Sequence, residues 1–459
     1  MRRLVVVVLA VNMLFGAPSA SAQVGVGSPN MTHVAHRAYA ERWGMIQPFG
    51  TDIEFARIAG RDYALAGTYR NGLQIIDITN PRRPRIVQTY DCAIAQGDVQ
   101  VFRRGSRTLV TYTADGSASN TFPNSRCYRD LGIRAKRYGT FIVDITDPKR
   151  PTTVGFVDVP KGSHNQSVHP SGRYLYNSNS DSRLPAAVEV VDIADPANPR
   201  RLADLPLGTG FEAHDITFSA DGSRAYIAAL THTLIADTTD PAHPVIVGRI
   251  LDQTIDLHHQ ADPITVTDPL LGRRTFLVVT DELNGAAGNG FCPGGGLHVF
   301  DITGELERAP VKVGFWAIPE IRTATDNKAC TSHVLRFYPK QKLMTIAWYD
   351  AGVRVVDVSG LAGVSVGVDP NMGNVGAGMR EIGYYTMPDA DTWSAKTNRI
   401  EPDGSFYLYG NDINRGLDVY RFDAKAPQSS SGGTWLTPDE LRVRKGRARA
   451  PVCVLRLSD

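Results

Sequence analysis

Four histidines in the 459-residue sequence could together bind a transition metal. Each begins a short segment that has the composition of a β-strand, and the four are His164, His214, His258 and His333. Imidazole is a common protein ligand for zinc, copper and iron. If the fold gathers these side chains, we expect a site for Fe, Cu, Zn or Mn. His259 could take the place of its neighbour His258 as the ligand.

Other residues at or next to equivalent positions could complete such a site. Carboxylates and amides could orient the imidazole rings or contact a bound molecule. The residues in this second group are Asp52, Asp98, Asn165, Asp215, His259 and Trp393. Trp348 and Tyr349 could line the same place, although packing between structural units is the simpler interpretation of these aromatic residues. No catalytic residue can be assigned, and no GxSxG motif is present.

The histidines also have a structural interpretation. A repeat protein can reuse one residue at one position, with its ring nitrogens hydrogen-bonded to the neighbouring unit. Both interpretations, ligand and packing, remain open from the sequence. The remaining histidines fit no repeated position and are expected at the surface or in turns; they are His33, His36, His169, His232, His243 and His298.

A repeated phrase predicts the elements that must position these residues. GLQIIDITNPRRP at 72–84 returns as GTFIVDITDPKRP at 139–151 and as AVEVVDIADPANP at 187–199, with weaker copies beginning at 231, 296, 352 and 416. Each copy is a run of β-branched residues followed in most cases by Asp and Pro. This pattern is typical of a strand that ends in a turn.

Two more strands precede each phrase, and a fourth follows it. The segment AHDITFSADGSRAYIAA at 213–229 shows a strand, a DG turn and a second strand. The aspartates of two consecutive phrases, Asp192 and Asp237, lie about 45 residues apart, which is the period of a propeller blade. Seven copies lie between about Gly50 and Asp423. The fold class is therefore predicted to be all-β, a seven-bladed β-propeller of four-stranded antiparallel blades.

The phrases resemble the LVIVD repeat of exported bacterial and archaeal β-propeller proteins. The resemblance rests on IIDITNP, IVDITDP, VVDIADP, IADTTDP, VFDITGE and VVDVSG, and it covers most of the mature chain. It implies a propeller outside the cytoplasm and no particular activity. The seventh copy, GLDVYRFDA, lacks the DP turn, so we expect it in the closing blade. A strand from residues 36–46 would complete that blade.

The sequence predicts four regions. Residues 1–22 have the basic start, apolar stretch and Ala-Ser-Ala end of a secretory signal peptide. Residues 23–49 form an N-terminal segment, 50–425 the propeller, and 426–459 a linker and C-terminal tail. We expect the mature protein to be periplasmic, secreted or on the cell surface, without a transmembrane span.

Five cysteines are compatible with export, because disulfides form in oxidising compartments. The predicted topology places Cys92, Cys127, Cys292 and Cys330 in loops on the histidine face. We predict the pairs Cys92–Cys127 and Cys292–Cys330, with Cys453 left over.

In a propeller the first strand of each blade is innermost, so the histidines would surround one mouth of the central channel. Two functions follow. The protein could be a binding or interaction module for a small molecule or a protein or cell-surface ligand at this mouth. Alternatively, it could be a metal-dependent enzyme, an oxidoreductase or a hydrolase. Loss of Arg2 and Arg3 with the signal peptide would balance 47 basic against 47 acidic residues, which argues against nucleic acid as a partner. We expect a monomer.

Overall fold

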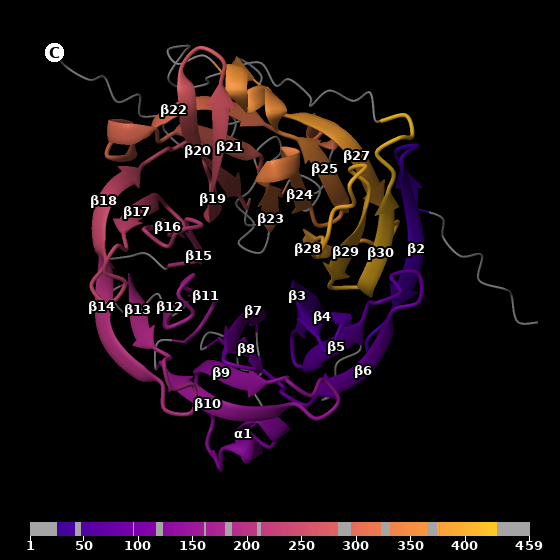
Figure 1. Ribbon diagram of the computed structural model, residues 1–459, viewed down its shortest axis with the longest axis vertical. Coiled ribbons are helices and arrows are strands. Elements are labelled where there is room, and N and C mark those ends of the chain that lie inside the picture. Colours follow the sequence, from indigo (N-terminus) through magenta and orange to yellow (C-terminus); the bar gives the residue numbers. More distant parts are fainter. Residues whose placement is uncertain are drawn as a thin grey trace, which may run out of the picture.

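Seven β-sheets stand around a common axis and form a closed ring (Figure 1). The computed structural model describes residues 25–41, 47–94, 96–115, 123–159, 162–179, 186–208, 213–282, 295–322, 331–364, 374–375 and 377–428. The predicted signal peptide, the pair Cys292–Cys330, Cys453 and the end of the tail lie outside these residues. The predicted fold, a seven-bladed propeller of four-stranded antiparallel blades, is confirmed.

The first four blades are antiparallel meanders whose strands run outward in chain order. Blade one contains β3 (Gly50–Ile58), β4 (Arg61–Thr68), β5 (Leu73–Asp77) and β6 (Arg85–Tyr90). Blade two contains β7 (Gln96–Arg104), β8 (Arg107–Ala114), β9 (Gly139–Asp144) and β10 (Thr152–Asp158). Blade three contains β11 (Gln166–Val168), β12 (Tyr174–Ser178), β13 (Ala186–Asp192) and β14 (Arg200–Gly208). Blade four contains β15 (Asp215–Phe218), β16 (Arg224–Ala228), β17 (Thr233–Asp237) and β18 (Val245–Ile250).

The last three blades carry the additions to this pattern. Blade five contains β19 (His258–Asp268), β20 (Gly272–Asp281), β21 (Leu297–Asp301) and β22 (Val311–Trp316), beside which β26 (Asn374–Val375) lies parallel. Blade six contains β23 (Leu335–Tyr338), β24 (Leu343–Ala347), β25 (Val353–Asp357) and β27 (Arg380–Thr386), extended by β1 (Val26–Gly27). Blade seven contains β28 (Thr392–Lys396), β29 (Phe406–Asp412) and β30 (Gly416–Phe422). The short helices are α1 (Arg126–Asp130), η2 (Gly304–Glu307), η3 (Pro319–Arg322), η5 (Pro339–Gln341) and η6 (Ser359–Gly363).

The ring closes through a strand from the N-terminal segment. β2 (Met31–Arg37) pairs antiparallel with β30 and forms the outer strand of blade seven. In Figure 1 the indigo β2 accordingly lies beside the yellow β30. The closing strand lies earlier in the chain than the expected residues 36–46. Its register is set by pairing across the ring, which the short-range sequence pattern does not contain.

The repeated phrase forms the third strand of each blade and the turn after it. In blade two, Asp144 accepts a hydrogen bond from the backbone N–H of Thr146 at 2.9 Å and pairs with Arg107 of β8 at 2.7 Å. Asp192 of blade three repeats both contacts, with Ala194 and with Arg173. The aspartate therefore joins the turn to the second strand, which explains its place in the repeat.

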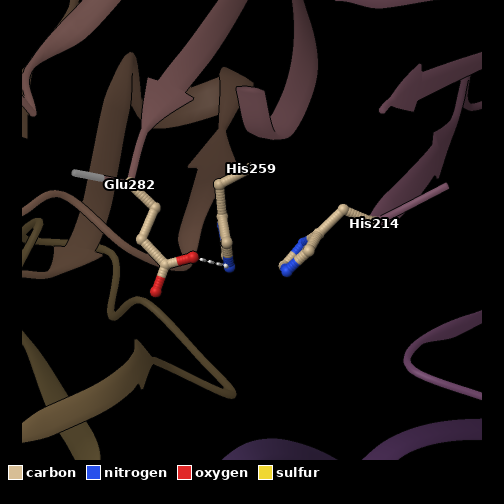
Figure 2. A group of neighbouring side chains, drawn as sticks. All are labelled: His214, His259 and Glu282. Carbon is tan, nitrogen blue, oxygen red and sulfur yellow. Dashed lines mark ion pairs between the residues drawn. The ribbon is translucent and has the colours of Figure 1, made fainter. Parts of the chain in front are cut away.

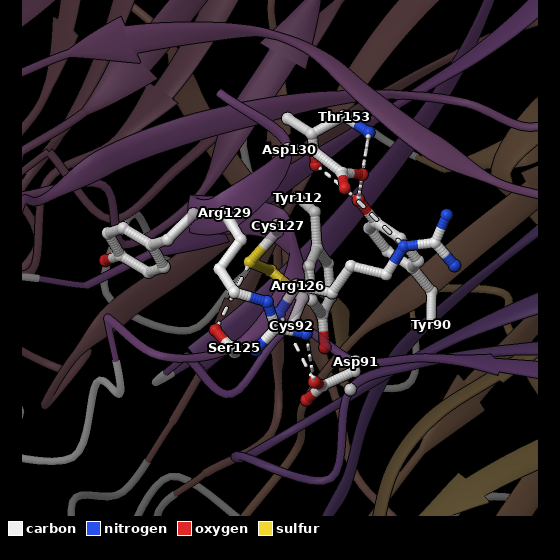
Figure 3. The surroundings of a disulfide bond; sticks show 12 residues. Tyr90, Asp91, Cys92, Tyr112, Ser125, Arg126, Cys127, Arg129, Asp130 and Thr153 are labelled. Carbon is white, nitrogen blue, oxygen red and sulfur yellow. Dashed lines mark hydrogen bonds and ion pairs between the residues drawn. A yellow bond between two sulfur atoms is a disulfide. The ribbon is translucent and has the colours of Figure 1, made fainter. Parts of the chain in front are cut away.

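A disulfide anchors the insertion of blade two (Figure 3). Cys92 and Cys127 are bonded, as predicted, and both are fully buried. Cys127 lies in α1, and its backbone N–H donates to the carbonyl of Asp91. The insertion that begins after β8 is thereby tied to the connection between blades one and two, on the face where the inner strands begin.

Candidate metal centre at the channel mouth

Four histidines from four consecutive blades form a row at the start of the inner strands. The ring centroids of His164 and His214 are 4.3 Å apart, those of His214 and His259 are 4.5 Å apart, and those of His259 and His333 are 4.2 Å apart. We call these four residues the histidine row. The closed ring thus brings together side chains that are far apart in the sequence.

His259, and not His258, belongs to the row. The two residues are adjacent in β19, and adjacent strand residues point to opposite faces of a sheet. The pairing register with β20 also shifts between His258 and Ala261. His258 lies inside the protein, where its Nδ1 contacts the hydroxyl of Thr233 at 2.8 Å. The placement of His258 as a ligand at the channel mouth is therefore wrong.

The expectation for the remaining histidines is also partly wrong. His169, His232 and His298 are buried, with at most 7% of each residue exposed. The Nδ1 of His298 lies 2.8 Å from the Lys312 ammonium, and that ammonium donates to Asp252 at 2.6 Å. These histidines belong to the packing between and within blades, and His243 remains an exposed turn residue.

Glu282, which follows β20, faces the row (Figure 2). Its carboxylate oxygens lie 3.7 Å from His259 Nε2 and 3.7 Å from His333 Nε2. The hydroxyl of Tyr349 donates to the same carboxylate at 2.7 Å. Ligand atoms of His214, His259 and Glu282 all lie within 4.8 Å of one another. Two imidazoles and one carboxylate are a donor set that suits divalent transition metals.

The hydrogen bonds of His333 show which of its ring nitrogens is available. Its Nδ1 lies 2.5 Å from the backbone carbonyl of Trp393, and because a carbonyl only accepts, Nδ1 must carry the hydrogen. In the neutral ring, Nε2 then presents a lone pair to Glu282, with no donor between the two acceptors. A ring N–H donated to a carbonyl is also the usual arrangement behind a metal-bound histidine.

Two buried nitrogens of the row have no hydrogen-bond partner among the described residues. They are Nε2 of His333 and Nδ1 of His214. Buried polar atoms normally have partners, and exceptions call for an explanation such as an ion. A cation bound by His214, His259 and Glu282 would be one such explanation for His214.

Burial lowers the pKa of three imidazoles of the row. It lowers the pKa of His259 and of His333 to about 3, with smaller contributions from neighbouring histidines, and it lowers the pKa of His214 well below its ordinary value. A neutral imidazole is the form that binds a metal. His214, His259 and His333 are therefore in the ligand form at neutral pH.

His164, at the end of the row, has a different set of partners. Its Nδ1 lies 3.0 Å from the carboxylate of Asp115, the residue that follows β8. Its Nε2 lies 3.3 Å from the Gln96 amide nitrogen. An imidazole oriented by a carboxylate is suited to move a proton. The structure thus separates His164, paired with Asp115, from the three residues that surround Glu282.

The second group of predicted site residues lies mainly below the row. The Asn165 amide donates to the backbone carbonyl of His214 at 3.0 Å, and the Trp393 ring packs edge-on against His333 with centroids 4.7 Å apart. Asp52, Asp98 and Asp215 lie further down the channel, where they line a cavity of about 460 Å³. His259 and Trp393 also line it, so the cavity reaches the histidine row.

Sequence reasoning missed Asp115 and Glu282 and favoured a packing role for Tyr349. All three follow the second strand of a blade. An acidic residue stands at or directly after the end of the second strand in three blades, as Asp115, Glu282 and Asp412. This repetition is the sequence signal that points to Asp115 and Glu282.

Comparison with known proteins agrees with the fold. A family model, the LVIVD repeat, matches residues 60–92. One LVIVD repeat is thus matched, in blade one. The matched residues comprise the second, third and fourth strands of that blade, and the seven-bladed ring is consistent with the LVIVD β-propeller family.

The solved structures similar to this chain are propellers with remote sequences. The periplasmic gluconolactonase of Pseudomonas aeruginosa is 13% identical, with a TM-score of 0.56 over 82% of this chain and 95% of that one. A putative 6-phosphogluconolactonase from Bacteroides fragilis is 10% identical, with a TM-score of 0.49 over 92% and 97%. At these identities the likeness concerns the fold alone. No curated protein matches this chain in sequence.

Within the described part of the chain, no helix is long and apolar enough to cross a membrane.

Proposed function

We propose that this propeller is an exported metal-dependent enzyme, a hydrolase or an oxidoreductase. Its metal would be held by His214, His259 and Glu282, with His333 as a further ligand. The observation that carries this proposal is that His214, His259 and Glu282 bring ligand atoms within 4.8 Å of one another, beside two buried ring nitrogens, His214 Nδ1 and His333 Nε2, that have no hydrogen-bond partner among the described residues. Buried polar atoms normally have partners, and a bound cation would supply one.

The donor set supports a Lewis-acid centre. Nitrogen and carboxylate donors without a thiolate suit Zn²⁺, and also Fe, Mn or Cu. A bound divalent metal of this kind would polarise a substrate carbonyl or lower the pKa of a water. The identity of the metal separates a hydrolase from an oxidoreductase.

The residues around the centre have separate tasks in this proposal. Tyr349 and the Trp393 carbonyl orient Glu282 and His333 through the hydrogen bonds described above. Asp115 orients His164, whose ring lies 4.3 Å from His214 and so can accept a proton from a group bound next to the centre. The cavity below the row would hold the remainder of the substrate.

Export and a monomeric state belong to the same proposal. The buried Cys92–Cys127 disulfide favours an oxidising compartment, and the sequence of residues 1–22 supports secretion. Each of the four metal-binding residues comes from one chain, so the centre requires no second copy.

The test is the metal content of protein purified from its natural compartment without a histidine tag. We expect about one equivalent of a transition metal per chain by elemental analysis, and its loss in both His214→Ala and Glu282→Gln. His243→Ala is the matched control, because His243 is 77% exposed on a turn of blade four. That variant should keep the metal.

Metal-free protein with unchanged thermal stability in His214→Ala would contradict the proposal. In that case the protein would be a binding module without catalysis, with its binding site at the same channel mouth. If the metal is found, hydrolysis of ester, lactone and amide probes, abolished by Glu282→Gln, checks the reaction class.

A further inference from the structure

The cavity below the histidine row presents hydrogen-bond acceptors from four blades. Asp52 of blade one, Asp98 of blade two, Asp215 of blade four and Asp262 of blade five all line it. The cavity measures about 460 Å³, within the size range of small-molecule sites. Its wall thus surrounds the propeller axis rather than lying in one blade.

The two cations of this wall are already paired. The Lys396 ammonium donates to Asp52 at 2.6 Å and to Glu54 at 2.9 Å. The Arg336 guanidinium donates to Glu54 at 3.0 Å through one nitrogen and contacts the other carboxylate oxygen through a second. Two positive charges therefore neutralise Asp52 and Glu54 and leave little capacity for an anionic ligand.

Three carboxylates have no cationic partner among the described residues. Asp98, only 8% exposed, accepts two hydrogen bonds from Gln166 on Oδ2, at 3.1 and 3.0 Å, while its Oδ1 has no hydrogen bond. Asp215 accepts only from the N–H of Ile216, on Oδ1. Asp262 accepts from Thr217 and Gln260, again on one oxygen. Each carboxylate therefore keeps one oxygen for a donor in the cavity.

We propose that this cavity is the substrate pocket and that the substrate carries a protonated amine. Asp98, Asp215 and Asp262 would receive the ammonium through charge-assisted hydrogen bonds. Trp393, which lines the cavity next to His333, offers an aromatic surface that also attracts a cation. The claim that the amine belongs to a substrate rests on the proposed function. Binding of the amine itself does not require the metal.

The experiment compares three sugars that differ mainly in charge: glucosamine, glucose and glucuronate. Binding to the full-length mature protein, with metal removed by a chelator, is measured by isothermal titration calorimetry at pH 7. We expect glucosamine to bind at least tenfold more tightly than glucose, and glucuronate not to bind. Asp215→Asn and Asp262→Asn should each weaken glucosamine binding fivefold or more.

Asp204→Asn is the matched control. Asp204 lies on β14, the outer strand of blade three, and pairs with Arg201 away from the channel. This variant removes the same charge and should bind glucosamine as the wild type does. Thermal unfolding of each variant shows that the fold is retained.

Equal binding of glucose and glucosamine, or no binding of any probe to folded protein, would overturn the amine assignment. So would tight binding of Ca²⁺ that Asp215→Asn abolishes, because the site would then hold an inorganic cation. Since metal content at the histidine row is measured separately, failure of this inference leaves the proposed metal centre to stand or fall on its own result.

Discussion

Two arcs of the ring use the same structural position differently. In blades three to six the inner strands begin with histidines, whereas in blades one, two and seven the corresponding residues are Thr51, Gly97 and Thr392. In the second arc the polar groups are paired: Thr51 donates to the carbonyl of Gly97, and Ser394 donates to the carbonyl of Thr51. In the first arc three ring nitrogens, His214 Nδ1, His258 Nε2 and His333 Nε2, have no hydrogen-bond partner among the described residues.

The difference separates an arc whose polar groups are paired with one another from an arc to which the proposed function assigns a metal. In the second arc, the backbones of blades one and two approach closely: a Cβ added to Gly67 would lie 1.9 Å from the carbonyl oxygen of Gly97. At the start of the inner strands in blades three to six, the rings of the histidine row meet one another, with centroids 4.2–4.5 Å apart. We expect substitutions in the two arcs to differ in their effects on metal affinity and on stability. Four experiments test this.

The largest effect is expected from His259→Ala. Removing a metal ligand should weaken metal affinity by roughly 100-fold or more, because even outer-shell changes cost about 10–100-fold. Thr51→Ala, at the equivalent end of blade one, should leave affinity unchanged. Competition with a chelator measures both. Equal losses in the two variants would abolish the distinction between the arcs.

Gly67→Ala should destabilise the fold by roughly 3 kcal/mol, since the added methyl overlaps backbone atoms that cannot move independently. Denaturant unfolding gives the free energy. The variant protein that remains folded should retain its metal. A substitution in the second arc would then change stability without changing metal binding. A fully stable Gly67→Ala protein would show that the blades are not in tight contact there.

Asp52 and Asp215 allow the same comparison for carboxylates. Asp52 has Lys396 as its partner, whereas burial, together with the neighbouring carboxylate of Asp262, raises the pKa of Asp215 to about 7. A raised pKa means that the folded state binds the proton more tightly than the unfolded state, so stability falls as pH rises from about 4 to about 7.

Asp215→Asn removes that dependence. The variant should match the wild type near pH 4 and exceed its unfolding free energy by roughly 1–3 kcal/mol at pH 8. Unfolding curves at both pH values check this. Parallel pH profiles for the two proteins would mean that Asp215 is compensated by a cation.

The smallest effect is expected from Tyr349→Phe. The phenol holds Glu282, so its loss should lower metal affinity about tenfold without changing the fold. The backbone of Tyr349 has a φ of +38°, a conformation unfavourable for this residue type, and Phe keeps that backbone and the ring packing on His333. Unaltered affinity would show that Tyr349 only packs there.

Much of the fold could be predicted from the sequence because each blade is a local structure. The phrase ending in Ile-Asp-Ile or Val-Asp-Ile specifies a strand, a turn and the aspartate that joins them, within a few residues. Seven copies then predict a seven-bladed ring, and the Cys92–Cys127 pair followed from the topology. The closing strand was placed too late, since its pairing spans the whole chain.

The candidate site could be predicted only in part. His164, His214 and His333 lie in the row as expected, but the sequence could not decide between His258 and His259, because a register shift in β19 sets which of them faces the channel. Glu282, Tyr349 and Asp115 come from the ends of second strands, and the sequence contains no information on how closely those ends approach the first strands of other blades.

The sequence by itself determined the repeating unit, the number of blades and the arc of the ring that carries histidine, because these depend on contacts between residues close in the chain. The tertiary structure alone decided which nitrogen of each histidine is available, which carboxylate faces it, and which aspartates in the channel lack a cation. Those properties arise from closing the ring, which places residues from distant blades within hydrogen-bond range and removes them from water.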